Sequence, residues 1–481
     1  MSAVGALAER VRAGRVSVAD VARDTAGRLR AADARGLNAT LHWTNDLLTA
    51  ESKRVDALRA AGGALPLAGV PIALKDNLVT TDAPTTCGSR ILGDYRSPYD
   101  ATVVTRLRAA GALIAAKTNL DEFAMGSSTE HSAFGRVLHP TDPARVPGGS
   151  SGGSAALVAA GVVPAALGSE TGGSVRQPAS FCGVVGVKPT YGRVSRFGLV
   201  AFGSSLDCIS VFGRTVDDAA RVLATIAGLD PRDATTVDRP PLLVEPVPAS
   251  LAGMRIGLPA EYFPADLDPG VRAGVERAAE RLRALGAVLV PVSLPHTAFA
   301  VPTYYVLAPA EAASNLARFD GVRYGARRIG AAGDLPALYR ATRGEGFGPE
   351  VRRRILVGTY VLSAGYYSAY YRKAQQVRNL IAADFTSAFL PGGVDLLLTP
   401  TTPTTAFRAG EKTADPVSMY LADIFVSAVS LAGLPALSLP AGLSDGLPVG
   451  AQLIAPAFGE ARMLAVAAAL EAGLDAGQEV R

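Results

Sequence analysis

The sequence predicts an α/β protein in which helices cover both faces of a central sheet. Short apolar runs that suit buried strands alternate with helical segments, and polar residues follow several of these runs directly. The chain has 481 residues, of which 49% are hydrophobic and 19% are charged, so it can bury a large core. No long polar or low-complexity tract indicates disorder. We therefore expect a folded enzyme.

The first 62 residues are predicted to be helical. Ser17 and Asp20 form a capping-box-like start for a helix that runs through Arg30. A second helix is expected from about residue 45 to residue 61. Residues 1–62 are thus expected to form a helical N-terminal segment ahead of the core.

The pattern changes to that of a buried strand after residue 67. Residues 68–74 form an apolar run that follows Pro66 and ends at the charged residues Lys75 and Asp76. In α/β proteins the carboxyl ends of such strands carry binding and catalytic groups. Lys75 is therefore expected at the end of a buried strand, where a loop begins.

A helix followed by a strand is the unit that repeats along the rest of the chain. A helix is expected over 102–110, a stop at Gly111 and a strand over 112–116. The same rhythm predicts a helix over 271–285 and strands over 287–292 and 394–398. Such alternation favours a largely parallel sheet. The Pro-rich stretch 230–249 is either a short linker or a surface excursion within one domain.

Composition argues against several functional classes. The 47 basic and 43 acidic residues are interspersed and leave a net charge of only +4, so the chain has no strong electrostatic footprint for nucleic acid or anionic lipid. Cys87, Cys182 and Cys208 are too scattered for a disulfide framework or a zinc site, which fits a reducing cytoplasm. We see no signal peptide, and the most apolar stretch, 155–167, is shorter than a membrane span. We expect a cytoplasmic protein without metal or membrane contact.

Two loops rich in glycine and serine are the main candidates for a reactive site. They occupy residues 147–154, with Ser150, and residues 168–176, with Ser174, and each leads into an apolar stretch. Glycines allow close backbone approach to a ligand, and a loop that enters a helix presents free N–H groups to negative charge. Such a loop suits an oxyanion hole, but a flexible turn explains the composition equally well. A phosphate-binding loop is disfavoured, because neither known glycine pattern is present.

A nucleophilic serine needs a base, and two residue types remain candidates for it. Histidine is the usual base, and the chain has four histidines, all outside the two loops: His42, His131, His139 and His296. Of these, His131 and His139 lie nearest to the loops in sequence. A buried lysine can also act, because burial lowers its pKa toward neutrality. Lys75 fits this role, unless it is a solvated lysine beside Asp76.

Both loops are similar to the signature of the amidase-signature family, whose members hydrolyse carboxamides through a Ser-cis-Ser-Lys triad. Lys75 precedes Ser150 by 75 residues, Ser150 precedes Ser174 by 24, and both separations agree with the family pattern. The resemblance implies that Ser174 is the nucleophile, Ser150 the bridging serine with a cis peptide bond, and Lys75 the ultimate base. It also implies an oxyanion hole formed by the backbone N–H groups of Thr171, Gly172 and Gly173.

Further segments are similar to one branch of this family, the glutaminase subunits of tRNA-dependent amidotransferases. They cover residues 121–130, 188–196 and 314–321, and the likeness extends from about residue 67 to residue 458. The resemblance implies that Arg354 binds the glutamine carboxylate and Asp423 its α-amino group, which suits a guanidinium fork and an anionic side chain. The other implied substrate-binding residues are Met125, Gly126 and Tyr305.

The resemblance also carries expectations for the whole chain. It implies a single amidase-signature domain over residues 1–481, with the core in 63–475 and a large mixed sheet between helices. It implies that the chain hydrolyses glutamine and supplies ammonia to partner B and C subunits, which convert Glu-tRNA(Gln) or Asp-tRNA(Asn) to the amidated form. We expect no cofactor in this chain, ATP and Mg²⁺ at the partner, and tRNA contact mainly through the partner. A stand-alone amidase and a non-catalytic binding protein are the alternatives.

The sequence departs from the family pattern at two places. Glu170 stands where an aspartate is usual, so an additional methylene must be accommodated beside the nucleophile loop. Residues 208–211 read Cys-Ile-Ser-Val in place of Gln-Ile-Gly-Pro. We expect the second departure to affect a surface or a partner contact.

Overall fold

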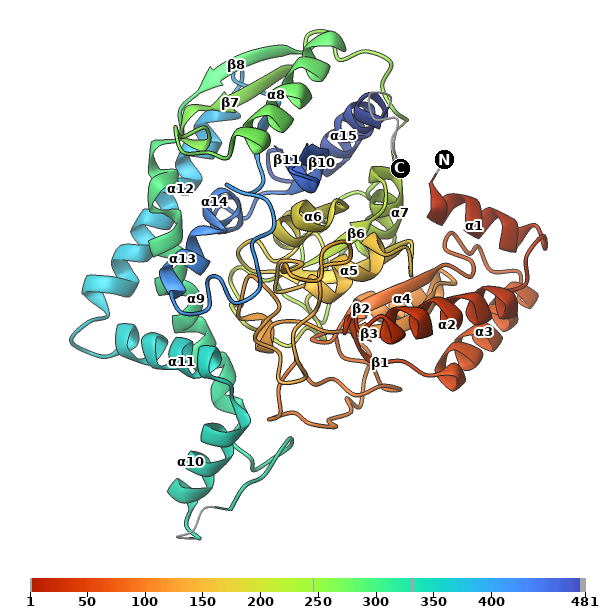
Figure 1. Cartoon of the computed structure of the whole chain (residues 1–481), viewed down its shortest axis with the longest axis vertical. Helices are drawn as coiled ribbons and strands as arrows, with labels where there is room; N and C mark the ends of the chain where they lie inside the picture. Colours follow the sequence, from red (N-terminus) through yellow and green to blue (C-terminus); the bar gives the residue numbers. More distant parts are fainter. Residues whose placement is uncertain (1, 245, 330–332, 476–481) are drawn as a thin grey trace.

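One mixed sheet runs through the molecule. The computed structural model describes residues 2–244, 246–329 and 333–475. Within these residues, eleven strands form a sheet in the order β1-β3-β2-β4-β6-β5-β10-β11-β9-β7-β8. The strands are β1 Thr40–His42, β2 Pro71–Lys75, β3 Leu113–Thr118, β4 Ala165–Glu170, β5 Val185–Lys188, β6 Cys208–Gly213, β7 Arg255–Pro259, β8 Val288–Val292, β9 Leu396–Pro400, β10 Ala436–Ser444 and β11 Leu447–Ile454. Strands from both halves of the chain therefore share one sheet (Figure 1).

The direction of the strands corrects the expectation of a largely parallel sheet. Parallel pairing is confined to β3-β2-β4 and to β9-β7-β8, whereas all other neighbours are antiparallel. One cause is the hairpin between β10 and β11, in which Ser444 pairs with Leu447 across the two residues Asp445 and Gly446. Both have positive φ, as the favoured two-residue hairpin turns require. The mixed sheet implied by the family resemblance is present.

One face of the sheet is covered by helices from both ends of the chain. Their buried side chains form one apolar core with alternate residues of the central strands, including Ile72 and Leu74 of β2. These helices are α1 Ala3–Arg12, α4 Thr102–Ala109, α7 Val216–Ile226, α8 Pro269–Ala284 and α15 Glu460–Asp475.

The opposite face is covered by two groups of helices. Near β1 to β4 the core contains Ala73 of β2 and side chains of α2 Val18–Ala34, α3 Asn45–Ala60, α5 Gly152–Ala159 and α6 Arg176–Cys182. Near β9 to β11 a second core packs against α9 Ala300–Asn315, α11 Pro349–Leu362, α12 Lys373–Ala388 and α14 Ile424–Leu431. Helices thus cover both faces of the sheet, as predicted.

Most elements expected from the sequence lie within a few residues of their predicted bounds. Ser17 caps the N-terminus of α2, and its side chain accepts a hydrogen bond from the N–H of Asp20. The predicted strand over 68–74 is β2, which begins three residues later and ends at Lys75. The stretch 230–249 forms neither helix nor strand in its described residues, and Leu243 on it is 70% exposed. In the described part of the chain, no helix is both long and apolar enough to cross a membrane.

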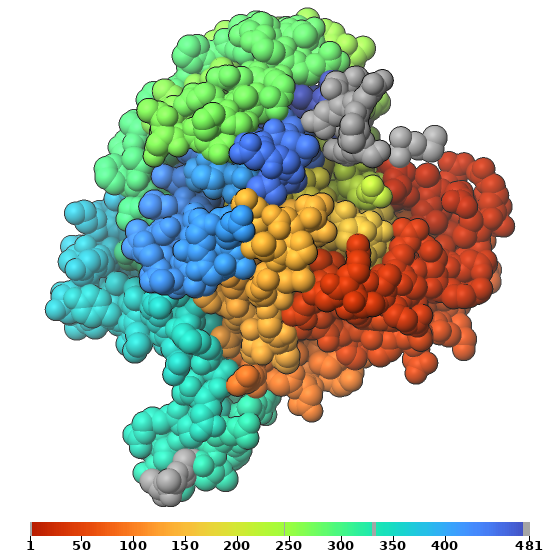
Figure 2. Space-filling model, in the orientation of Figure 1, coloured from red at the N-terminus to blue at the C-terminus, as the bar shows by residue number. Residues whose placement is uncertain are grey.

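A helical arm projects from the body of the molecule. It contains α10 Leu335–Gly346 and leads into α11, from which the chain continues through the π-helix η5 Ser368–Arg372 into α12. Figure 1 shows α10 below the body, and Figure 2 shows the same region as a projection from the surface. The short helix α13 Pro416–Leu421 lies just before α14 in the chain.

Candidate active site

Lys75 is completely buried at the carboxyl end of β2. Its Nζ lies 2.7 Å from Oγ of Ser150, 2.8 Å from Oγ of Ser151 and 3.2 Å from the carbonyl oxygen of Ser169. Burial disfavours the charged form and lowers the pKa of Lys75 to about 7, while Asp121 opposes this shift. The interpretation of Lys75 as a solvated lysine is therefore wrong, and a neutral amine is accessible near neutral pH.

Ser150 is held in the loop that leads into α5. The Gly149–Ser150 peptide bond is cis, as the family resemblance implies. The carbonyl oxygen of Ser150 accepts a hydrogen bond of 3.2 Å from the N–H of Asp121. A Cβ atom on Gly149 would lie 2.2 Å from Oδ2 of Asp121, so only glycine fits there. The fully buried loop is fixed by packing, which contradicts the alternative of a flexible turn.

Ser174 lies in the loop that connects β4 to α6. Its residue is 7% exposed, and its carbonyl oxygen accepts a hydrogen bond of 3.2 Å from the N–H of Ser151, which joins the two glycine-rich loops. Because β2 and β4 are parallel neighbours, Lys75 and the Ser174 loop meet at the same edge of the sheet. We call Lys75, Ser150, Ser151 and Ser174 the serine–lysine cluster.

Glu170 stabilises the Ser174 loop through hydrogen bonds to the backbone that follows Ser174. Its Oε2 accepts hydrogen bonds of 3.0 Å from the N–H groups of Val175 and Arg176, and its Oε1 pairs with the guanidinium of Arg176. Both side chains are fully buried. The longer side chain of Glu170 is thus accommodated by a paired charge and by two backbone donors that follow Ser174.

The residues proposed for the oxyanion hole are anchored on their other sides. Thr171 donates through Oγ1 to Oδ1 of Asp207 at 2.6 Å, and the carbonyl oxygen of Gly172 accepts a hydrogen bond of 2.6 Å from Ser430. A Cβ atom on Gly173 would lie 2.1 Å from Cγ2 of Val426, so this position also requires glycine. The backbone of the loop is therefore held rigidly beside Ser174.

Arg354 lies on the buried side of α11, with 3% of its side chain exposed. Its Nε donates to Oε1 of Glu350 at 2.8 Å, and its guanidinium lies 5.1 Å from the ring centre of Tyr305 and 5.5 Å from that of Tyr420. Within the described residues, Arg354 makes hydrogen bonds only through Nε, which leaves both Nη atoms available to a carboxylate. The exposed Arg352, two residues earlier, has no such environment.

Asp423 presents a complementary unpaired charge. Its Oδ2 accepts a hydrogen bond from Oγ of Ser127, whereas its buried Oδ1 has no hydrogen-bond partner in the described part of the chain. A Cβ atom on Gly173 would lie 3.1 Å from this Oδ1, so the carboxylate borders the Ser174 loop. Burial raises the pKa of Asp423 to about 7. We call Arg354 and Asp423, with Glu350 and Ser127, the charged subsite.

The three further substrate-binding candidates occupy different environments. Tyr305 stacks on Tyr420 with ring centres 3.6 Å apart and borders Arg354. Gly126 packs against the side chain of Asp121, where a Cβ atom would lie 2.3 Å from Cγ. Met125 is fully buried in the apolar core beside α9 and α14. Of the three, the structure brings only Tyr305 against the guanidinium.

Several residues of the site were missed by the sequence reasoning. Ser127 lies in the segment 121–130 that carries the family resemblance, and Glu350 lies one helical turn before Arg354. The position of each residue was visible in the sequence, but neither position indicated a role for the side chain. Tyr420 donates from its hydroxyl to Oε1 of Glu350 at 3.1 Å across 70 residues of sequence, and this pairing depends on tertiary packing alone.

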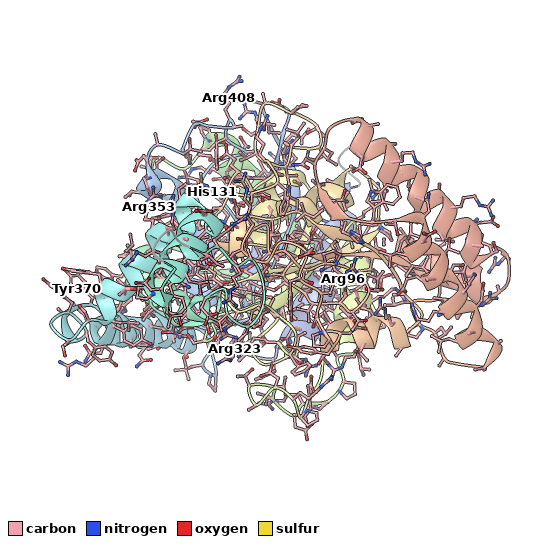
Figure 3. The ribbon with its side chains drawn as sticks, turned by 90° about the horizontal axis from the view of Figure 1, so that it is seen from below. Arg96, His131, Arg323, Arg353, Tyr370 and Arg408 are labelled. Carbon is pink, nitrogen blue, oxygen red and sulfur yellow. The ribbon has the colours of Figure 1, made fainter. Side chains whose placement is uncertain are left out.

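Histidine has no hydrogen bond to the serine–lysine cluster in the described residues. The ring of His139 bonds to the carbonyl oxygen of Phe181, and that of His296 bonds to Asp384. His131 uses its backbone N–H to donate to Asp121, and Figure 3 shows its position relative to Arg353. The lysine is the candidate base that the geometry supports.

The departure at residues 208–211 lies in the interior. These residues belong to β6, they are all buried, and Cys208 pairs with Glu170 of β4. The expectation of a surface or partner contact is therefore wrong. The stretch follows Asp207 directly and forms a central strand that supports the nucleophile loop.

Comparison with known proteins shows the family of this chain. The family model described as "Amidase" matches residues 21–464. The chain belongs to the amidase family. It is 56% identical to the A subunit of the glutamyl-tRNA(Gln) amidotransferase of Carboxydothermus hydrogenoformans, over 97% of this chain and 96% of that protein.

Solved structures of two relatives extend the comparison. One is the crystal structure of the A subunit of the glutamyl-tRNA(Gln) amidotransferase of Thermotoga maritima, whose sequence is 49% identical to this chain. The two structures match with a TM-score of 0.73 over 84% of this chain and 83% of that one. The native peptide amidase of Stenotrophomonas maltophilia is 32% identical, with a TM-score of 0.82, and the match covers 98% and 96%. The amidase fold is thus shared with enzymes of different substrates.

Proposed function

We propose that this amidase-family chain is the glutaminase subunit of a cytoplasmic tRNA-dependent amidotransferase. The observation that carries the proposal is the charged subsite, in which the free Nη atoms of Arg354 and the free Oδ1 of Asp423 match the α-carboxylate and α-ammonium groups of an amino acid. The free Nη donors of Arg354 and the free carboxylate oxygen of Asp423 together select a zwitterion over a simple amide. The names of the relatives in Carboxydothermus and Thermotoga support the same reading.

The reaction proceeds through an acyl-enzyme. Oγ of Ser174 forms a bond to the side-chain carbonyl carbon of glutamine, and its proton passes through Ser150 to the neutral amine of Lys75. Backbone N–H groups of residues 171–173 stabilise the oxyanion. The proton then returns to the leaving nitrogen, the C–N bond breaks and ammonia departs. Water then attacks the ester, and its proton passes through Ser150 to Lys75. The bond between the acyl carbon and Oγ of Ser174 breaks, glutamate departs, and the proton returns to Oγ of Ser174, which leaves Lys75 neutral again.

Ammonia is the product that a partner consumes. In the proposed assembly, B and C subunits receive it and amidate Glu-tRNA(Gln) or Asp-tRNA(Asn), with ATP and Mg²⁺ bound at the partner and tRNA contacted mainly there. The present chain needs no cofactor for glutamine hydrolysis, because Lys75 and the two serines supply all proton transfers.

Substrate discrimination tests the proposal against a stand-alone amidase of broad specificity. We expect the wild-type chain, with its B and C subunits, to hydrolyse glutamine with a kcat/KM at least about 100-fold above that for acetamide, as two charge-assisted contacts imply. Equal kcat/KM values for the two amides would favour the stand-alone amidase. Failure to hydrolyse either amide would favour a non-catalytic binding protein.

A further inference from the structure

A long segment near the charged subsite lacks acidic residues. Residues 351–383 contain no aspartate or glutamate, although the whole chain has 43 acidic residues. The same segment contains five of the chain's 14 tyrosines and six of its 47 basic residues. It comprises most of α11, the π-helix η5 and the first part of α12. This charge and aromatic bias is unlike the balanced composition of the rest of the chain.

Many of the large hydrophobic side chains of this segment are exposed. Residues 363–370 are all exposed, and η5 buries none of its residues. Of the 24 large hydrophobic side chains that are exposed in the described residues, seven lie between Leu356 and Leu380. Leu356 itself is 70% exposed. Isolated apolar side chains on a surface are ordinary, but a cluster of this density marks an interaction site.

Five of these side chains form one continuous surface. Leu356 and Tyr360 lie one turn apart on α11, and Val357 lies beside them. The ring centre of Tyr360 lies 4.3 Å from that of Tyr366 and 6.0 Å from that of Tyr370, so α11 and η5 present their rings together. We call these five residues the tyrosine surface. Tyr370 and Arg353 lie on the same side of the molecule in Figure 3.

Cations border the tyrosine surface at both ends. Arg352 and Arg353 lie one turn before Leu356 and Val357, and Arg372 and Lys373 follow Tyr370 closely. All four are exposed, and Arg353 also pairs with Glu350 of the same helix. Tyrosine and apolar anchors within a charged rim are the typical anatomy of a protein interface, and a rim of one sign requires a partner of the opposite sign.

We propose that the tyrosine surface is a docking site for an acidic face of a partner subunit. The inference rests on the proposed function, because an ammonia-producing chain must be joined to the one that consumes ammonia. Helix α11 links the two sites physically, since it carries Arg354 on its buried side and Leu356 and Tyr360 on its exposed side. A partner seated here lies against the helix that binds the substrate.

The observations favour a protein over a nucleic acid at this surface. The rings of Tyr360, Tyr366 and Tyr370 contact one another, and aliphatic Leu356 and Val357 extend the apolar area. Surfaces that bind single-stranded nucleic acid separate their rings to stack on bases, within a groove dominated by cations. An acidic protein face with apolar side chains can pack against the tyrosine rings and pair with the cations at the rim.

The test measures the affinity of this chain for its B and C subunits as a function of salt. We expect Tyr366→Ala combined with Tyr370→Ala to weaken association at least about 30-fold, as removal of interface anchors does. Arg372→Glu with Lys373→Glu should weaken it about tenfold and reduce its salt dependence. Leu356→Ala should weaken it, whereas Leu243→Ala, at a position that is also 70% exposed, should not.

The thermal melt of each free variant chain should stay close to that of wild type, which shows that the variants fold. Association of every variant with wild-type affinity would overturn the docking inference and leave the proposed function intact. Loss of tRNA binding while the B and C subunits still bind would assign the surface to RNA and overturn it too. If the wild-type chain neither binds the subunits nor prefers glutamine, the proposed function falls, and the inference with it.

Discussion

The serine–lysine cluster and the charged subsite differ in how far their polar atoms are paired within the protein. In the cluster, Nζ of Lys75 has three oxygen partners between 2.7 and 3.2 Å. In the subsite, Oδ1 of Asp423 has no partner in the described part of the chain, and Arg354 is bonded only through Nε. A buried charged group that lacks hydrogen-bond partners destabilises the folded protein unless a ligand supplies those partners. The first region is therefore assembled before substrate arrives, and the second is completed by it.

This difference separates the chemistry of the amide from recognition of the amino acid. Changes in the cluster should affect every amide equally, because each uses the same nucleophile and base. Changes in the subsite should affect glutamine alone, because a simple amide has neither an α-carboxylate nor an α-ammonium group. Glutamine and acetamide, measured side by side, therefore distinguish the two regions.

The largest effect is expected from Ser174→Ala. Removal of the nucleophile should lower kcat by at least about 10⁴-fold for both glutamine and acetamide, because no other group forms the acyl-enzyme. Ammonia release measures the rate, and a thermal melt close to that of wild type shows that the variant is folded. A residual rate near that of wild type for either amide would rule out Ser174 as the nucleophile.

A smaller and selective effect is expected from Arg354→Ala. Loss of the guanidinium fork should raise KM for glutamine about 100-fold, or about 2.7 kcal/mol, while kcat/KM for acetamide stays within threefold. Arg352→Ala is the matched control, since it removes an exposed arginine from the same helix. Equal losses for both amides would show that Arg354 supports the fold of the site and not the carboxylate.

The pH dependence of the two substrates should separate the regions without any mutation. Burial lowers the pKa of Lys75 to about 7, so the base is protonated and inactive below that pH for any amide. Burial raises the pKa of Asp423 to about 7, so its charge is also lost below that pH, but only glutamine needs it. Below pH 7, kcat/KM should fall about tenfold per pH unit for acetamide and more steeply, toward about 100-fold, for glutamine.

Asp423→Asn provides the control for this pH prediction. The variant should bind glutamine weakly at all pH values, and its kcat/KM for glutamine should follow the shallower profile of acetamide. Profiles of equal slope for both substrates in the wild-type protein would contradict the assignment of Asp423 to the ammonium group.

The same contrast explains how much the sequence could predict. Lys75 was placed correctly because a buried strand has a local signal, an apolar run that ends in charge. The antiparallel pairs were missed, although Asp445 and Gly446 are a recognisable hairpin turn. The contact between Tyr420 and Glu350 has no local signal, because it joins two helices through tertiary packing. Strands and loops could be predicted from sequence, and the family resemblance implied Ser150 beside Lys75, but the protein partners of Arg354 and Asp423 could not be predicted.

The smallest effect in this series concerns Glu350, which orients Arg354 without any expected contact to substrate. Its Oε1 receives hydrogen bonds from Nε of Arg354 and from the hydroxyl of Tyr420. Glu350→Ala removes this anchor, so the flexible guanidinium can turn against the surrounding rings, and KM for glutamine should rise about fivefold to tenfold. Acetamide hydrolysis should be unchanged.

Glu350→Gln decides whether orientation or charge is responsible. The side-chain amide oxygen of this variant still accepts both hydrogen bonds. If the role of Glu350 is to orient Arg354, KM for the substrate glutamine should therefore stay within about threefold of wild type. If the negative charge itself is needed, the Gln variant should be impaired as strongly as the Ala variant. Loss of a negative charge beside Arg354 also favours an incoming carboxylate, so impairment of the Gln variant would contradict simple electrostatics as well as the positioning role.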